Sequence, residues 1–149
     1  LNGSPKGGMS VTMQYVAYLG KKLPAFDFEI YNVGKRIKGL ERDREQFDAI
    51  IRGIGDSDAV LWAFGVYMEM VPYPLKRFIE LIFERNAADV FEGKYTASLS
   101  TSARWLDNLA HDYVQAITDD LGMQFCGFHS AETEELEKEE EQKRLVLFG

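Results

Sequence analysis

Hydrophobic and polar positions along this chain alternate between two periods, and this alternation predicts a succession of helices and strands. Apolar residues between Met13 and Leu23 recur with a helical period, and Pro24 ends that helix. Residues 26–31 instead place an apolar side chain at every second position, as a half-buried strand does. The first part of the chain therefore predicts a helix followed by an edge strand.

The same alternation continues through the rest of the sequence. Residues 58–64 are nearly all apolar, which is typical of a central strand covered by helices on both faces. Because each strand and helix together occupy roughly 30 residues, the size of a βαβ unit, we expect a parallel sheet in a single domain over residues 1–149. Further strands are expected over 94–100 and 123–128, and further helices over 47–54, 75–83 and 109–121.

A glycine-rich turn spanning Asn2–Thr12 joins the start of the chain to the first helix. Its backbone N–H groups can converge on an anion, and the helix adds unpaired donors and the positive end of its dipole. The spacing matches neither G-x-x-x-x-G-K-[ST] nor G-x-G-x-x-G, and a plain helix cap is the alternative interpretation. The expected phosphate-binding residues are Ser4, Lys6, Ser10, Val11 and Thr12, through hydroxyl, ammonium or backbone N–H groups.

A phosphate-binding turn of this kind normally follows a buried strand, whereas only Leu1 precedes it here. Either the opening strand is missing from the sequence, or Arg144–Gly149 supplies it from the other end. Under the first alternative, Ala131–Gly149 forms one acidic helix with three leucines partly inward and a run of glutamates on its solvent side. These leucines are Leu136, Leu145 and Leu147, and the glutamates are Glu134, Glu135, Glu137, Glu139, Glu140 and Glu141.

Composition narrows the function classes. The net charge of −7, from 17 basic and 24 acidic residues, argues against a nucleic-acid surface. No apolar run approaches the ~20 residues of a membrane span. Cys126 is the only cysteine, so the chain forms no internal disulfide and offers no cysteine-ligated iron–sulfur or zinc site. We expect no metal site and a cytoplasmic protein.

Two further loops are expected to meet the glycine-rich turn, because open parallel sheets bind ligands beyond the carboxyl ends of their strands. The loop over residues 64–73 is rich in aromatic residues and methionine, where exposed loops are usually polar. It could wall a planar ring, or it could be a core plug or a subunit interface. The residues expected at such a ring are Phe64, Gly65, Tyr67 and Met68.

The other loop, over residues 100–105, follows the next strand. Ser100, Thr101 and Ser102 offer hydroxyl and backbone donors for the edge of a heterocycle, beside Arg104 and Trp105. A Ser/Thr turn that caps the following helix is the alternative.

Three segments of the chain resemble the flavodoxin-like NAD(P)H-dependent FMN reductases. The opening turn of that family reads roughly G-S-P-[RK]-x-x-x-S-x-T, and Gly3–Thr12 matches it. Residues 57–67 are similar to the segment A-D-x-[IV]-[IV]-[FW]-x-x-P-x-Y, with Gly65 where the family usually has proline, and residues 74–80 are similar to the helix [LP]-K-x-[FL]-[IL]-[DE]. The cysteine cluster of the related iron–sulfur flavoproteins is absent.

The resemblance implies a doubly wound five-stranded parallel sheet of order 2-1-3-4-5 with helices on both faces. It implies FMN as cofactor, NAD(P)H as co-substrate and a homodimer or homotetramer, with a quinone, a flavin or another small molecule as electron acceptor. The flavin supplies the chemistry, so no side chain is expected to be catalytic; His111 could relay protons or be structural. A flavodoxin-type electron carrier and a cofactor-free dimeric binding module are the alternatives.

Overall fold

The structure, a computed structural model, describes residues 1–103, 107–133 and 135–149. Within these residues a parallel sheet has three strands in the order β1-β2-β3. The strands are β1 (Ala59–Gly65), β2 (Tyr95–Ser102) and β3 (Gln124–Glu132). The expected parallel sheet is thereby confirmed, as are the central strand and the two strands that follow it; the last strand runs on to Glu132.

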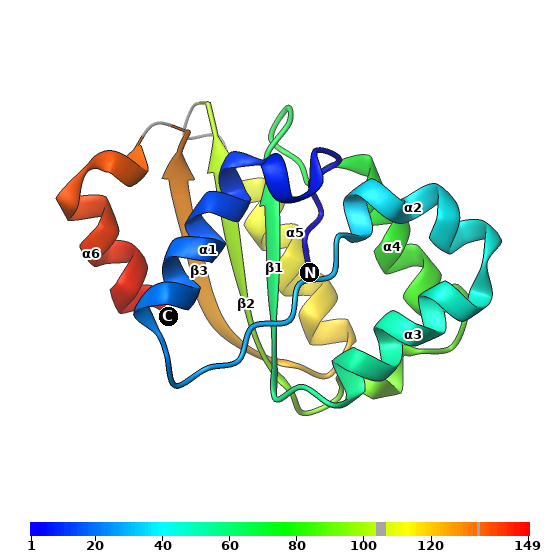
Figure 1. Cartoon of the computed structure of the whole chain (residues 1–149). Helices are drawn as coiled ribbons and strands as arrows, with labels where there is room; N and C mark the ends of the chain where they lie inside the picture. Colours follow the sequence, from blue (N-terminus) through cyan, green and yellow to red (C-terminus); the bar gives the residue numbers. More distant parts are fainter. Residues whose placement is uncertain (104–106, 134) are drawn as a thin grey trace.

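Helices cover both faces of this sheet (Figure 1). Helices α1 and α6 pack on one face around Leu99, whereas α5 lies behind the other face with α4 beside it. The α-helices are α1 (Val11–Lys22), α2 (Val33–Arg42), α3 (Arg44–Gly55), α4 (Tyr73–Glu84), α5 (Asn108–Asp120) and α6 (Glu139–Phe148). The short 3-10 helices are η1 (Gly7–Met9), η2 (Ala88–Phe91) and η3 (Glu135–Glu137).

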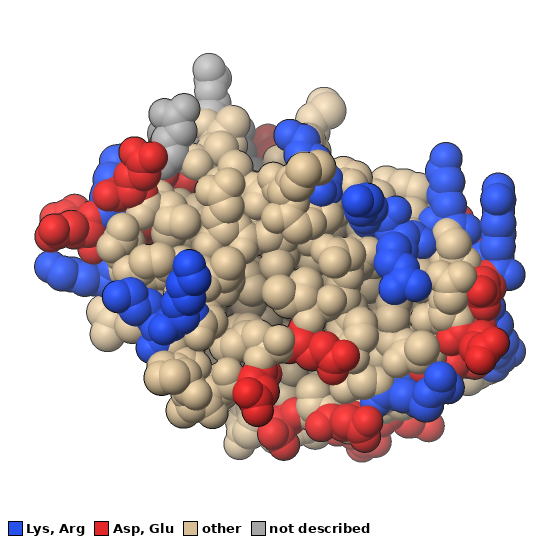
Figure 2. Space-filling model, viewed as in Figure 1, with Lys and Arg blue, Asp and Glu red and all other residues tan. Residues whose placement is uncertain are grey.

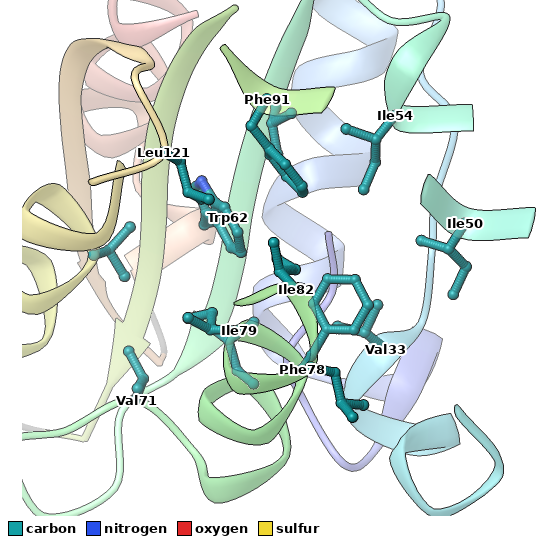
Figure 3. Packing of buried hydrophobic residues seen from close by; sticks show 14 of the residues in the cluster. Val33, Ile50, Ile54, Trp62, Val71, Phe78, Ile79, Ile82, Phe91 and Leu121 are labelled. Carbon is teal, nitrogen blue, oxygen red and sulfur yellow. The ribbon is translucent and has the colours of Figure 1, made fainter. Parts of the chain in front are cut away.

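The larger apolar core joins β1 to helices α2–α5 (Figure 3). Trp62 is fully buried there, stacks on Phe91 with ring centroids 6.2 Å apart, and donates its indole N–H to Thr96 Oγ1 at 2.9 Å. That hydrogen bond allows the indole to be buried without leaving its polar atom unpaired. The core therefore fixes β1, and with it the point at which the following loop begins.

Residues 26–31 do not form the expected edge strand. Phe26, Phe28 and Ile30 are 60%, 40% and 46% exposed, so the predicted apolar face is not buried. The carbonyl oxygen of Tyr31 accepts a hydrogen bond from the backbone N–H of Asn2 at 2.8 Å. A strand requires a neighbour along its length, and within the described residues this segment meets one only at its end.

Helix α2 is absent from the prediction made from the sequence. Its buried residues Val33, Ile37 and Leu40 follow the i, i+4, i+7 spacing of a helix, but the remaining positions are mostly charged or glycine. This narrow apolar stripe is sufficient to hold the helix in place, because α2 packs against α3 and α4 rather than against the sheet.

The C-terminal prediction needs correction. Residues Arg144–Gly149 are not a strand, because α6 covers 139–148, and 131–149 is not one helix, because β3 continues to Glu132. Leu145 is buried as expected, but Leu147 is 87% exposed. Glu134 lies outside the described residues.

Glu141 is not on the solvent side. Its side chain is only 3% exposed, and its Oε1 lies 2.6 Å from His129 Nε2. The exposed Arg144 donates to the other carboxylate oxygen at 3.0 Å. A carboxylate can be buried here because two partners compensate for its lost hydration.

Charge is unevenly distributed over the face seen in Figure 2. Acidic side chains gather along its lower edge and basic ones at the upper right, where Figure 1 places α2, while the middle is largely uncharged. In the described part of the chain, no helix is long and apolar enough to cross a membrane.

Candidate functional site

The three loops expected to form the site meet at the carboxyl edge of the sheet. Thr12, in the first turn of α1, has its Oγ1 2.6 Å from Thr101 Oγ1, near the end of β2. A Cβ atom built on Gly65, the last residue of β1, would lie 4.0 Å from Thr12 Oγ1 and 3.9 Å from the carbonyl oxygen of Thr101. The backbone N–H of Val66 donates to that carbonyl at 3.0 Å. The structure thus brings Thr12, Gly65 and Thr101 into one place.

The glycine-rich turn is organised by its own polar groups. Asn2 is almost fully buried, and its Oδ1 accepts the backbone N–H of Ser4 at 3.0 Å. The hydroxyl of Ser4 accepts the N–H of Lys6 at 3.3 Å, and the carbonyl of Ser4 accepts the N–H of Gly7 at 3.0 Å. Gly7 has a φ of 59°, a left-handed conformation that favours glycine. The turn is therefore a folded loop, with the ammonium group of exposed Lys6 available to an anion.

Helix α1 begins with a capped turn. The Oγ of Ser10 accepts the N–H of Met13 at 3.3 Å, so Ser10 is the N-cap. The alternative interpretation, a plain helix cap, is therefore correct for the acceptor role of the Ser10 hydroxyl. The same hydroxyl still has its own hydrogen, which it can donate to a phosphate. The N–H groups of Val11 and Thr12 lie in the first turn of α1, where they have no intrahelical acceptor.

Helix α2 clamps the turn from the other side. The N–H of Gly34 donates to the carbonyl of Asn2 at 3.0 Å, and Asn2 Nδ2 donates to Asn32 Oδ1 at 2.8 Å. A Cβ built on Gly34 would lie 2.2 Å from the carbonyl oxygen of Gly3. Only glycine permits this approach of the two backbones, so α2 and the turn are packed as one unit.

The loop after β1 presents apolar side chains to solvent. Tyr67 is 54% exposed and Met68 is 96% exposed, so neither is a core plug. Paired hydrogen bonds between the backbones of Tyr67 and Met70, at 3.2 and 3.3 Å, close a tight turn in which Met68 and Glu69 have φ values of 51° and 69°. Positive φ is costly for residues other than glycine, so this loop holds its tip in a strained conformation.

Phe64 does not fulfil the expected role as a ring wall. Its side chain is fully buried, and its ring centroid lies 5.7 Å from that of His111. Because side chains alternate along a strand, Phe64 points into the core on the α5 side of the sheet. Only its backbone can contribute to the edge.

Successive side chains at the end of β2 point to opposite faces of the sheet. Thr101 points to α1, whereas Ser100 is fully buried on the α5 side and donates to Asp107 Oδ2 at 2.6 Å. The Oγ of Ser102 is also buried and has no hydrogen-bond partner among the described residues. The Ser100 hydroxyl is thus already occupied, and that of Ser102 is the one that needs an acceptor or donor. Arg104 and Trp105 lie outside the described residues.

His111 and its partners form a buried polar cluster that sequence patterns did not identify as a unit. His111 Nδ1 lies 2.7 Å from Ser98 Oγ and His111 Nε2 lies 2.9 Å from Ser100 Oγ. The ring stacks on Phe128 at 4.3 Å. The signal available in the sequence is the spacing of Asp107 and His111, one turn apart at the start of a helix that packs on a serine-rich strand.

Burial lowers the pKa of His111 to about 4, against the opposing effect of the Asp107 and Asp112 carboxylates. The unfolded chain binds a proton below pH 6.5, but the folded chain does not do so until about pH 4. We therefore expect the free energy of unfolding to fall by up to ~3 kcal/mol through this residue as the pH drops across that window. Denaturant unfolding at pH 7 and pH 4.5 checks this.

The variant His111→Gln provides the control for this pH dependence. It should lose less stability than the native chain between the two pH values, because glutamine does not titrate. Equal losses in both proteins would contradict the assignment.

The donors at this edge fit a flavin mononucleotide. The turn supplies N–H, hydroxyl and ammonium groups for a phosphate, as in other anion sites at helix N-termini. The Ser102 hydroxyl, which has no hydrogen-bond partner among the described residues, provides a polar group for the edge of a heterocycle. Gly65 places backbone without a side chain beside Thr12 and Thr101. Exposed Tyr67 and Met68 are suited to contact a flat ring.

Comparison with known proteins also indicates an FMN-binding protein. A family model described as NADPH-dependent FMN reductase matches residues 1–130. No curated protein matches the chain. Among solved structures, the Trp repressor binding protein from Bacillus subtilis is similar at 16% identity and a TM-score of 0.76, covering 99% of this chain and 94% of that one.

Two other solved structures are similar. An NADH:FMN oxidoreductase (EMOB) in its apo form has 15% identity and a TM-score of 0.77, covering 99% of this chain and 82% of that one. An FMN-dependent NADH-azoreductase from Bacillus anthracis str. Ames Ancestor, in complex with FMN, has 11% identity and a TM-score of 0.67, covering 98% and 90%. At these identities the likeness establishes the fold, which is flavodoxin-like α/β.

Proposed function

The chain belongs to the NADPH-dependent FMN reductase family, and we propose that it passes electrons from NAD(P)H through FMN to a quinone, a flavin or another small acceptor. It is a flavin-dependent oxidoreductase, and FMN is its cofactor. The observation that carries the proposal is the convergence of Thr12, Gly65 and Thr101 at the carboxyl edge of the sheet. Family membership favours an enzyme over an electron carrier or a cofactor-free module.

Residues of the chain bind and orient the cofactor in this proposal. We assign Ser4, Lys6, Ser10, Val11 and Thr12 to the phosphate, and Gly65, Tyr67, Met68, Thr101 and Ser102 to the ring, with Phe64 and Ser100 acting through their backbones. When bound, the flavin accepts a hydride from NAD(P)H and passes two electrons to the acceptor. Backbone N–H groups at its pyrimidine edge would stabilise the negative charge of the reduced form.

We propose a homodimer or a homotetramer. Tyr67, Met68 and Tyr73, the last at the start of α4, are all more than half exposed in and beside the loop after β1. Apolar side chains gathered in this way mark contact surfaces on soluble proteins. A second copy of the chain could cover them beside the ring.

We also propose a single domain with the five-strand order 2-1-3-4-5. Asn2 is bonded to Tyr31 on one side and forms a parallel bridge to Ala63 on the other. These two contacts support the proposal that segments through Asn2 and Tyr31 take the two positions beyond β1 in that order. A chain with one cysteine suits a reducing compartment, and we place the protein in the cytoplasm.

Reconstitution with FMN tests the function. We expect the purified protein to bind FMN and its yellow colour to bleach anaerobically on addition of NADPH or NADH, because the family uses a nicotinamide donor. Adding a quinone should restore the colour by withdrawing the electrons from the bound flavin. The measurement is visible absorbance. Bound FMN that reacts with neither nicotinamide would favour an electron carrier, and failure to bind FMN would overturn the proposal.

A further inference from the structure

A continuous chain of polar side chains lies buried between β2, β3 and α5, directly behind the candidate flavin edge. Asp107 Oδ2 is its centre: it accepts the hydroxyls of Ser100, at 2.6 Å, and of Ser130 on β3. Ser100 and Ser130 are register partners in the sheet, and Ser100 immediately precedes Thr101. One carboxylate therefore ties two neighbouring strands together near their carboxyl ends.

The polarity of this network follows from the acceptor at its end. A carboxylate has no hydrogen to give, so Ser100 and Ser130 both donate to it. The Ser100 hydroxyl has then used its hydrogen, and it accepts from His111 Nε2–H at 2.9 Å. A neutral imidazole with its hydrogen on Nε2 accepts at Nδ1, so Ser98 donates to Nδ1 at 2.7 Å. Each step is directed toward Asp107.

Burial makes the Asp107 carboxylate a strong local charge. Asp107 is 2% exposed, and His111, whose ring lies 3.7 Å from Oδ2, is neutral at pH 7. Asp107 precedes the first residue of α5, and its carbonyl accepts the N–H groups of Ala110 and His111. The hydroxyls of Ser100 and Ser130 donate to the carboxylate without neutralising it.

We propose that Asp107 is a positioning residue of the flavin site, which fixes the ends of β2 and β3 and lowers the reduction potential of the bound FMN through its charge. This inference rests on the proposed function. Reduction adds negative charge to the ring, and a nearby buried carboxylate opposes that charge across a medium that screens poorly. Ser100 and Thr101 link Asp107 to the flavin site. Ser100 is hydrogen-bonded to the carboxylate, and Thr101, the next residue, lies at the edge of the sheet where the ring is proposed to bind.

The midpoint potential of bound FMN tests this role. In Asp107→Asn the charge is lost while the shape is kept, so we expect the potential to rise. In Ser130→Ala the charge stays but loses a hydroxyl whose positive end partly offsets it, so the potential should fall. Asp112→Asn, an exposed residue on the same helix, removes the same formal charge and should leave the potential unchanged.

The opposite signs of the two expected potential shifts distinguish an effect of the Asp107 charge from a general loosening of the structure. Shifts of the same sign in Asp107→Asn and Ser130→Ala, or no shift in either, would overturn the inference while leaving FMN binding intact. If Asp107→Asn does not fold, the sign in Ser130→Ala decides. A native protein that binds no FMN would instead refute the proposed function, and the inference with it.

Discussion

Replacing Gly34 by alanine is expected to destabilise the protein by at least ~3 kcal/mol and to weaken FMN binding together with stability. The new Cβ would lie 2.2 Å from the carbonyl oxygen of Gly3 and 2.7 Å from the carbonyl carbon of Ser4. Both atoms belong to the backbone of the phosphate turn, so no side chain can move aside. Overpacking typically costs ~1–3 kcal/mol, and a clash between backbones belongs at or above the upper end.

Helix α2 provides a matched control for this prediction. At Gly39, in the same helix, the nearest atom to an added Cβ is Gln46 Oε1 at 3.6 Å, an ordinary contact. Gly39→Ala should therefore raise the free energy of unfolding by up to ~1 kcal/mol through helix propensity. Thermal or urea unfolding measures both variants, and FMN titration measures the turn. Equal stability of the Gly34 and Gly39 variants would show that α2 does not clamp the turn.

The double variant Ser10→Ala and Thr12→Ala is expected to weaken FMN binding by roughly 10²- to 10⁴-fold. Ser10 accepts a backbone N–H and keeps its hydroxyl hydrogen, while the Thr12 and Thr101 hydroxyls share one hydrogen between them and keep the other. With Thr101 as the donor to Thr12, the Thr12 hydrogen is free for the phosphate, and the double variant removes two donors. Each charge-assisted hydrogen bond contributes ~1.5–3 kcal/mol, which gives the expected range. Fluorescence titration of FMN measures the change.

Loss of the α1 cap needs its own control, because Ser10→Ala should also cost ~1 kcal/mol of stability. Asp43 is the N-cap of α3 and accepts the N–H of Gln46 at 3.2 Å, away from the phosphate turn. Asp43→Ala should lose a similar amount of stability and leave FMN affinity unchanged. If it weakened FMN as much as the double variant does, stability rather than the phosphate site would explain both results.

Sequence periodicity was sufficient where an element is buried on a wide face. Strand β1 and helix α4 show this, because nearly every inward position is apolar. It failed where burial is decided by partners distant in sequence. Helix α2 buries a narrow stripe against two other helices, and the alternating 26–31 segment has no neighbouring strand along its length among the described residues.

The candidate site also contains some residues that the sequence could identify and others that depend on how distant segments pack. Local chemistry identified the phosphate turn and the carboxyl edge, since glycines, hydroxyls and strand ends are visible in a sequence. The Asp107 cluster depends on which face of β2 each serine takes, and the buried pair of His129 and Glu141 depends on how α6 packs. The acidic run gave no indication that one of its glutamates would face a histidine on the adjacent strand β3.

The central claim is that FMN binds with its phosphate on the Ser4–Thr12 turn and its ring beside Gly65 and Tyr67. The most direct measurement is a crystal structure of the protein grown with FMN. The account predicts density for the phosphate within hydrogen-bond distance of the first-turn N–H groups of α1 and for the ring against the loop after β1. FMN bound at another surface, or no FMN at a saturating concentration, would contradict it.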